Sequence, residues 1–392
     1  MNGIMKKLLI VNNNMKVGGV QKSLCNLLHG LQGRYDVTLC LFRATGAYME
    51  QLPAGVQVVE CKGPVRYLSM SQGECRGLDK LIRGGLALLC KCFGRNKIMK
   101  LLLAFTKDVA GEYDCALAYL HNGNIRSFYG GVQEFVLKKV KAGKKVAFLH
   151  CDYRNCGGHY PANDRLLEGF ERVAACSESC RRAFVEALPF LAERCVTVPN
   201  FHRYDQIRAL AAEKTVAYDP DCIHLLSVAR LAHEKGLERG IRALAEAVKA
   251  GHRVKLHLVG GGGMEQQLRQ LAQELGLQEQ VVFYGEQTNP YPYIAAADLF
   301  LLTSYHEAAP MVIDEAVCLG LPVLTVRTTS SHEMVSLRHA GWVCDNDQAA
   351  LNEALLQVLS DPAERKAVAQ ELRQQTVDNT QAAQGLRSLI EE

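Results

Sequence analysis

Short apolar runs of the kind found in strands alternate with amphipathic stretches along most of this chain. Such alternation is typical of parallel sheets whose strands are joined by crossover helices. A chain of 392 residues exceeds one ordinary hydrophobic core, so we expect two α/β domains. In the first half the predicted strands are Lys7–Val11, Val37–Phe42, Val56–Glu60, Cys115–Tyr119, Val146–His150, Arg172–Cys176 and Cys195–Val198.

The alternation pauses after Asn200 and resumes at Ile223. The predicted strands of the second half are Ile223–Ala229, Lys255–Val259, Val281–Phe283, Leu299–Leu302, Pro322–Val326 and Gly341–Val343. We therefore predict a doubly wound parallel-sheet domain in each half. The expected division is a first domain over residues 1–200, a linker over 201–220, a second domain over 221–362, and a helical tail over 363–392 that can pack back on the first domain.

Composition and charge exclude several classes of protein. The net charge of +4 is small for this length, and no array of basic and aromatic residues would stack bases, so no nucleic-acid partner is expected. The fifteen cysteines are scattered without zinc-ligand spacing, which predicts free thiols in a reducing cytosol. The first apolar run, Leu8–Val11, is too short for a signal-peptide core, and no run approaches the ~20 residues of a transmembrane helix. We expect a cytoplasmic protein.

Residues 62–107 form a basic segment with ten lysines and arginines against two acids, Glu74 and Asp79. Apolar patches at Leu86–Leu89 and Leu101–Leu103 are interleaved with these charges. Basic amphipathic segments of this type often lie on anionic membrane surfaces. The alternative is an ordinary helical insert whose charges face water. The sequence therefore suggests an anionic membrane surface as a partner and a peripheral position on the inner face of the cell membrane.

Two glycine motifs follow predicted strands and open predicted helices. Gly18 and Gly19 follow the first strand, and Gly260 and Gly261 begin a run of four glycines after Lys255–Val259. Glycine lets backbone N–H groups approach an anion without a Cβ in the way. A plain tight turn explains the same residues. The first motif lacks the third glycine of the dinucleotide fingerprint, which disfavours a nicotinamide cofactor.

Charged residues follow two strands of the predicted second domain. Arg230 comes directly after the first strand, and Lys235 stands just before the next helix; two cations there suit a diphosphate. Glu307 lies in the loop after Leu299–Leu302, and Glu315 falls in the helix that follows. Carboxylates accept hydrogen bonds from vicinal diols, so one can hold a sugar and the other a ribose.

In the first domain, His150 ends a strand at the corresponding edge of its sheet. That position makes it the histidine of this chain that we single out as a site residue.

Taken together, these residues resemble the retaining glycosyltransferases of family 4, of the type found in bacterial surface-polysaccharide synthesis, which have the GT-B architecture. Arg230 and Lys235 resemble the family's phosphate-binding pair, and Glu307 and Glu315 match its two glutamates separated by seven residues. Gly320–Val323 matches the strand entry that follows them. The resemblance implies two Rossmann-like domains facing across a cleft that binds the donor.

The resemblance also implies a role for each candidate site residue. Arg230 and Lys235 would hold the donor diphosphate, Glu307 the hydroxyls of the transferred sugar, and Glu315 the ribose. His150 would come from the first domain to close over the sugar. The remaining donor-binding residues implied are Gly18, Gly19, Gly260, Gly261, Gln287, Ala308, Ala309, Pro310, Met311 and Val312.

The implied activity is transfer of a hexose-type sugar with retention of anomeric configuration, without a metal or a resident cofactor. A UDP-sugar is the favoured donor and a GDP-sugar an alternative; the acceptor would be a saccharide or a lipid-linked saccharide. Three other functions stay open at this point. They are a catalytically inactive scaffold of the same family, a nucleotide-sugar epimerase of the same fold, and a nicotinamide oxidoreductase suggested by the glycine loops alone.

Overall fold

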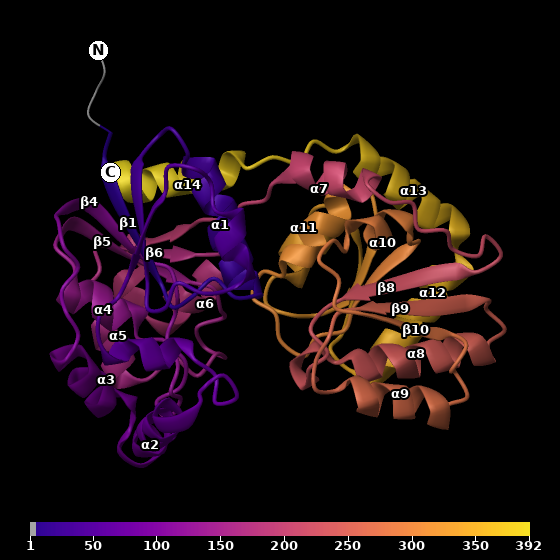
Figure 1. Cartoon of the computed structure of the whole chain (residues 1–392). Helices are drawn as coiled ribbons and strands as arrows, with labels where there is room; N and C mark the ends of the chain where they lie inside the picture. The colour runs from indigo at the N-terminus through magenta and orange to yellow at the C-terminus, as the bar shows by residue number, and fades with distance from the viewer. Residues whose placement is uncertain (1–4) are drawn as a thin grey trace. The chain divides into compact units, whose positions relative to one another are not determined.

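The computed structural model describes residues 5–392 and divides into two α/β units, each with its own parallel sheet (Figure 1). The first domain contains the chain up to His202 together with the segment Asn379–Glu392. The second domain is Arg203–Asp378. Two doubly wound parallel-sheet domains are the fold class that the alternation predicted, and the prediction is confirmed.

The first domain is built on a seven-stranded parallel sheet with the strand order β3-β2-β1-β4-β5-β6-β7. The chain builds outward from β1 to β3 and then returns to place β4 on the other side of β1. Strands β1, β4 and β5 are therefore neighbours, and their carboxyl ends share one edge. The strands are β1 (Lys7–Asn12), β2 (Asp36–Leu41), β3 (Gln57–Glu60), β4 (Tyr113–Ala118), β5 (Ala142–Leu149), β6 (Arg172–Ala175) and β7 (Cys195–Thr197).

Helices cover both faces of this sheet because its central strands are apolar on both sides. Leu8 and Ile10 of β1 pack in one buried cluster with Leu24 and Leu28 of α1 (Gly19–Leu31). The other helices of the first domain, apart from the last, are α2 (Gly77–Phe93), α3 (Arg95–Ala104), α4 (Val132–Lys139), α5 (Pro161–Leu167) and α6 (Glu178–Ala187). Two of them, α2 and α3, come from the basic segment 62–107.

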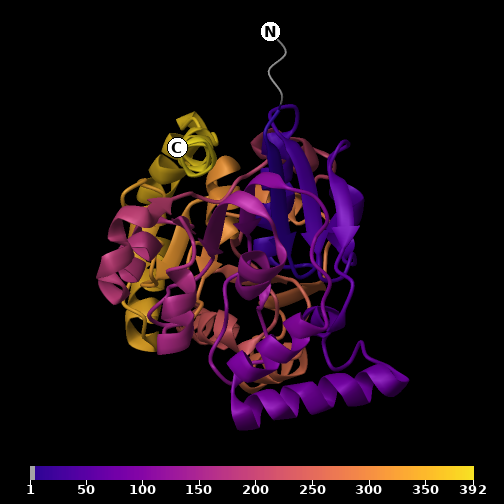
Figure 2. The same cartoon turned by 90° about the vertical axis from the view of Figure 1, so that its left-hand side faces the viewer.

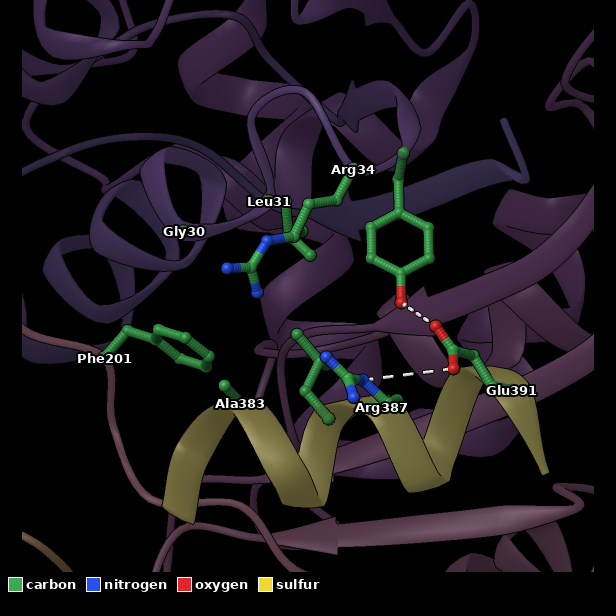
Figure 3. Close-up of a pocket in the computed structure, with 9 residues that line it drawn as sticks. Gly30, Leu31, Arg34, Phe201, Ala383, Arg387 and Glu391 are labelled. Carbon is green, nitrogen blue, oxygen red and sulfur yellow. Dashed lines mark hydrogen bonds and ion pairs between the residues drawn. The ribbon is translucent and has the colours of Figure 1, made fainter. Parts of the chain in front are cut away.

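The last helix of the chain, α14 (Thr380–Glu391), belongs to the first domain. Its Leu386 and Leu389 are buried in the same cluster as α1. Beside α1 it borders a hollow of about 480 Å³, where the Tyr35 hydroxyl donates a 2.9 Å hydrogen bond to Glu391 (Figure 3). The lining residues are Gly30, Leu31, Arg34, Tyr35, Phe201, Ala383, Leu386, Arg387 and Glu391. The end of the chain thus completes the core of the domain in which the chain begins.

The second domain is built on a six-stranded parallel sheet with the order β10-β9-β8-β11-β12-β13. Its strands are β8 (Ile223–Val228), β9 (Val254–Val259), β10 (Val281–Gly285), β11 (Leu299–Leu302), β12 (Val323–Val326) and β13 (Gly341–Cys344). Its helices are α7 (Tyr204–Ala212), α8 (Leu237–Lys249), α9 (Glu265–Glu274), α10 (Tyr291–Ala296), α11 (Met311–Cys318), α12 (Gln348–Ser360) and α13 (Pro362–Gln374). All thirteen predicted strands are present in the two sheets, and twelve lie within about two residues of their expected bounds; β5 begins at Ala142, four residues before the expected Val146.

The structure differs from the expected domain division in two places. The segment expected as a linker, 201–220, contains α7, whose Ile207 is buried in the core beside α10 and α11. The tail expected over 363–392 is two helices, with α13 in the second domain and α14 in the first. Both differences have one cause. A short amphipathic helix buries only a few residues, so its sequence pattern is a weaker signal of domain membership than the alternation of strands and helices.

Within residues 5–392, no helix combines the length and the apolar character needed to cross a bilayer.

Candidate functional site

The predicted charged residues gather at the carboxyl edge of the second sheet. Strands β8 and β11 are neighbours, although the chain passes through β9 and β10 between them. The loops that leave β8 and β11 therefore diverge from a topological switch point. In open α/β sheets this is the place where ligands bind.

Lys235 and Glu307 meet at this switch point. The Lys235 Nζ donates a 2.7 Å hydrogen bond to Oε1 of Glu307, and the Ser304 hydroxyl donates to the same oxygen at 2.8 Å. The two charged side chains are 26% and 11% exposed. A cation and a carboxylate that the sequence assigned to different parts of one ligand thus lie side by side.

The backbone around Gly236 holds these two loops together. Gly236 has φ +56°, and a Cβ there would lie 2.4 Å from the carbonyl oxygen of Thr303. The Thr303 hydroxyl donates to the carbonyl of Lys235 at 3.2 Å, and the amide of Tyr305 donates to the carbonyl of Glu234 at 3.0 Å. Glycine at 236 is therefore required because the β11 loop passes directly against it.

Arg230 lies at the mouth of the same edge, with its side chain 70% exposed. It forms an ion pair with Glu234, four residues along the chain. Partial burial opposes ionisation of Glu234, but its hydrogen bond to its own backbone and the Arg230 charge hold its pKa below the usual value. Exposed ion pairs of this kind contribute little stability, so the guanidinium can exchange this partner for a bound anion at small cost.

The glycine run after β9 packs against the backbone of the β8 loop. A Cβ at Gly260 would lie 1.9 Å from the carbonyl oxygen of Ala229, and one at Gly262 would lie 2.3 Å from that of Leu231. The amide of Gly260 donates to the carbonyl of Gly285 at 2.8 Å. We expected these glycines to free N–H groups for a ligand. The structure shows that Gly260 is required by the protein's own backbone, and that its N–H is already used.

Gly261 and Gly263 are less constrained than their neighbours. A Cβ at Gly261 would make an ordinary 3.6 Å contact with Glu286, and one at Gly263 would meet nothing within 4 Å.

Helix α11 begins directly after the Glu307 loop. Pro310 has extended backbone and precedes the first turn, so the amides of Met311 and Val312 belong to the helix N-terminus, where N–H groups lack an intrahelical carbonyl. The Ser330 hydroxyl donates to the carbonyl of Ala308 and ties the loop to the one after β12. Ala309 completes the loop between these contacts. A helix N-terminus next to Lys235 is suited to an anion.

Glu315 lies in the second turn of α11 and is 1% exposed. We expected both glutamates to face an open crevice, whereas the structure places Glu315 almost entirely out of solvent. Gln287, in the loop after β10, donates to the carbonyl of Tyr284 at 2.8 Å and accepts from the Tyr293 hydroxyl at 3.4 Å. Its amide is thereby held in one orientation.

In the first domain, the candidate His150 directly follows β5. Its ring lies 4.7 Å from that of Tyr119, and its Nε2 has no hydrogen-bond partner among residues 5–392. Burial, together with the neighbouring His121, lowers the pKa of His150 to about 3. The imidazole is therefore neutral at pH 7, with one ring nitrogen available to a ligand.

His121 is a second histidine at this edge, and the sequence analysis missed it. It follows β4, the neighbour of β5, and its Nδ1 also lacks a partner within the described chain. Burial lowers its pKa to about 4. His121 could have been found by looking for polar residues after the strand next to β5. This requires the strand order, which the sequence pattern does not contain.

Gly18 and Gly19 precede and begin α1 at the same edge. A Cβ at Gly19 would meet nothing within 4 Å, and one at Gly18 would meet only the flexible end of the Gln21 side chain, at 2.6 Å. Glycine is therefore not required here by the protein itself. Asn13, buried at the end of β1, accepts a 3.4 Å hydrogen bond from Gln21 and was not among the predicted residues.

Across residues 5–392, no three His, Cys, Asp or Glu side chains form a group that could hold a metal ion.

Comparison with known proteins gives these residues a context. Residues 213–375 match the family model "Glycosyl transferases group 1". The chain is 34% identical over 129 residues to the lipopolysaccharide core biosynthesis glycosyltransferase LpsD of Rhizobium meliloti, covering 33% of this chain and 38% of that protein. It is 33% identical over 151 residues to the lipopolysaccharide glucosyltransferase WaaG of Escherichia coli, covering 38% and 40%. These alignments span about two fifths of each relative's length.

Solved structures match over nearly the whole chain. The Anabaena Alr3699/HepE structure in complex with UDP has a TM-score of 0.66 at 20% identity and covers 98% of this chain and 99% of that one. The structure of WaaG, a glycosyltransferase involved in lipopolysaccharide biosynthesis, has a TM-score of 0.62 at 19% identity, with coverage of 98% and 100%. Residues 213–375 are thus similar to the group 1 glycosyl transferases, and the chain as a whole has the two-domain GT-B fold.

Proposed function

We propose that this chain is a retaining glycosyltransferase of family 4. It moves a hexose-type sugar from a nucleotide-diphosphate donor to a saccharide or lipid-linked saccharide acceptor in the synthesis of a polysaccharide or glycoconjugate. The observation that carries the proposal is the Lys235–Glu307 pair at the switch point of the second sheet, inside the segment that matches the glycosyl transferase family.

The donor diphosphate binds Lys235 and Arg230. Both cations have partners that a ligand can replace: Glu307 for the first and the exposed Glu234 for the second. When phosphate oxygens take over Lys235, Glu307 accepts hydrogen bonds from the sugar hydroxyls instead. The amides at the start of α11 lie beside both groups and stabilise the same anion.

The remaining donor contacts come from the loops around this pair. Glu315 binds the ribose from its buried position in α11, and Gln287 lies against the base. Because the Anabaena structure contains UDP, a UDP-sugar is the first donor to test, and a GDP-sugar the second.

Catalysis then rests on positioning and on charge stabilisation at the leaving group. The acceptor attacks the face of the sugar from which the diphosphate departs, and a phosphate oxygen takes the acceptor's proton. Lys235 and Arg230 balance the charge that grows on the diphosphate, a task that a metal ion performs in other enzymes. His150 is neutral, so it can hydrogen-bond a sugar hydroxyl without opposing the positive charge that develops on the ring carbon.

We place the reaction in the cytoplasm. All fifteen cysteines are free thiols, and some lie close together without a bond: the sulfur atoms of Cys40 and Cys61 are 3.3 Å apart. A reducing compartment keeps such pairs as thiols.

A thermal-shift screen against UDP, GDP and ADP tests the proposal. A ligand that binds the native state raises Tm by mass action. We expect one nucleotide to raise Tm in the native protein and in the control Lys249→Ala, whose side chain is 80% exposed, but not in Lys235→Ala. Sugar transfer from the matching nucleotide sugar would then be measured directly. Nucleotide binding without transfer to any acceptor would favour the scaffold, and stabilisation by NAD alone would favour the oxidoreductase.

A further inference from the structure

Helix α2 carries its apolar residues on the side that faces solvent. They recur at the three- and four-residue spacing of one helix face. Leu78, Leu81 and Leu88 are 70%, 73% and 62% exposed, and Phe93 is 59% exposed. Ile82 and Leu89 lie between them on the same face, at 37% and 41%. Figure 2 shows α2 along the border of the first domain, away from its sheet.

Two charged residues of α2, Asp79 and Arg83, face the protein instead. Asp79 accepts hydrogen bonds from Arg66 at 3.0 Å and from the Tyr67 hydroxyl at 2.7 Å. The Arg83 Nε donates to the carbonyl of Met70 at 2.6 Å. Cys90 is fully buried. An ordinary surface helix turns its apolar stripe to the core, whereas α2 turns most of its large apolar side chains to solvent. The hydrogen bonds of Asp79 and Arg83 and the burial of Cys90 fix the orientation of the helix.

The cations of the segment supply a second observation. Lys80 and Lys91 are exposed and stand three helical turns apart, on one flank of the apolar face. Arg76, also exposed, is one turn before Lys80. Arg95 does not take part: it is 2% exposed and paired with Glu134.

The two acidic residues of the basic segment already form ion pairs with cations of the same chain. Residues 62–107 contain two carboxylates, and each has an internal cation: Glu74 pairs with Lys16 at 2.5 Å, and Asp79 pairs with Arg66 at 3.0 Å. The outward surface of α2 therefore combines apolar side chains and unbalanced positive charge.

We propose that this outward face of α2 docks the protein on an anionic lipid surface. The leucines and Phe93 enter the boundary between headgroups and acyl chains, while Lys80 and Lys91 stay at the level of the lipid phosphates. Charge favours lipid over a second copy of the chain, since two copies joined through this face would bring the same cations together. The proposal does not depend on the residues proposed to bind the diphosphate, which lie in the other domain.

Co-sedimentation of the full chain with vesicles tests this docking. We expect binding to vesicles that contain phosphatidylglycerol, weaker binding to phosphatidylcholine alone, and release as salt rises. Leu81→Glu should lower the partition coefficient about tenfold, because it places a charge at the centre of the apolar face. Lys80→Gln should lower it about fivefold on the anionic vesicles only.

Leu337→Glu is the matched control, because Leu337 is 65% exposed but lies in the second domain. It should leave lipid binding unchanged. The nucleotide-induced Tm shift should be the same in Leu81→Glu as in the native protein, which separates a failure of docking from a failure of the donor site.

Three results would overturn the proposal. They are no sedimentation with anionic vesicles at low salt, equal loss of binding in Leu81→Glu and Leu337→Glu, or a dimer in the absence of lipid that Leu81→Glu dissociates. The last result would assign the face to self-association.

Discussion

The two sheets present different chemistry at their carboxyl edges. In the second domain the edge is ionic, with Lys235 paired to Glu307 and Arg230 paired to Glu234. In the first domain the two histidines that follow β4 and β5, His121 and His150, are uncharged at pH 7 because they are buried, and we refer to this pair as the neutral edge. Similar strand orders thus support unlike surfaces. The ionic edge suits a diphosphate, and the neutral edge suits the hydroxyl groups of a sugar.

The largest expected effect comes from removing a cation of the ionic edge. Lys235→Ala should lower kcat/KM about 10³-fold, because a preorganised cation at the leaving group is lost. Binding of the free nucleoside diphosphate, measured by calorimetry, should weaken as well. The Lys249→Ala control should show neither change, since its side chain is exposed on α8 away from the switch point. Near-native turnover in Lys235→Ala would mean that the diphosphate binds elsewhere.

The glycines at the two sheet edges also differ, because Gly260 is required by a close backbone contact and Gly19 is not. A second test compares substitutions at these positions. Gly260→Ala should lower the free energy of unfolding by about 3 kcal/mol, because φ is +141° and the new Cβ would overlap the carbonyl of Ala229. Gly263→Ala, in the same loop, and Gly19→Ala, in the first domain, should each stay within about 0.5 kcal/mol, because a Cβ there meets nothing within 4 Å. Chemical denaturation measures all three.

If Gly19→Ala leaves stability intact but weakens transfer, the glycine there is needed by a ligand and not by the fold. If Gly260→Ala is as stable as the native protein, the close approach to Ala229 is not a constraint in solution.

The sequence predicted the strands well because their signal is local. Apolar runs such as Leu299–Leu302 can be recognised as strands from their own residues, and the sheet class follows from their alternation with helices. The reason for glycine at 260 is not local: it is the approach of Ala229 from another strand. His121 was missed for a similar cause, since its importance comes from lying beside His150 in the folded sheet. The amphipathic character of the basic segment was visible, but not that its apolar side faces outward.

A third test addresses the neutral edge. His150→Gln should lower kcat about 10²-fold, because a hydrogen bond to the reacting sugar is lost or misplaced. Nucleotide affinity should remain close to native, since the diphosphate and base contacts that we propose belong to the second domain. An equal loss of nucleotide binding in His150→Gln and Lys235→Ala would remove the distinction between the two edges.

The smallest expected effect concerns a buried histidine of the second domain, His257, which lies in strand β9. His257 is 2% exposed, its Nε2 lies 2.8 Å from Nδ1 of His224, and its Nδ1 lies 3.1 Å from the Tyr284 hydroxyl. Burial, the neighbouring His224 and Lys255 lower the pKa of His257 to about 3, below the ~6.5 of an unfolded chain.

Between these two pKa values the unfolded state binds a proton that the native state does not, so stability is lost as pH falls below ~6.5. From pH 7 to pH 5 this one group should lower the free energy of unfolding by about 1–2 kcal/mol. His257→Phe should flatten the dependence by that amount, whatever its effect on stability at pH 7. An unaltered slope in His257→Phe would mean that the imidazole is reached by protons in the native state, and that the sheet of the second domain is less closed than its buried strands indicate.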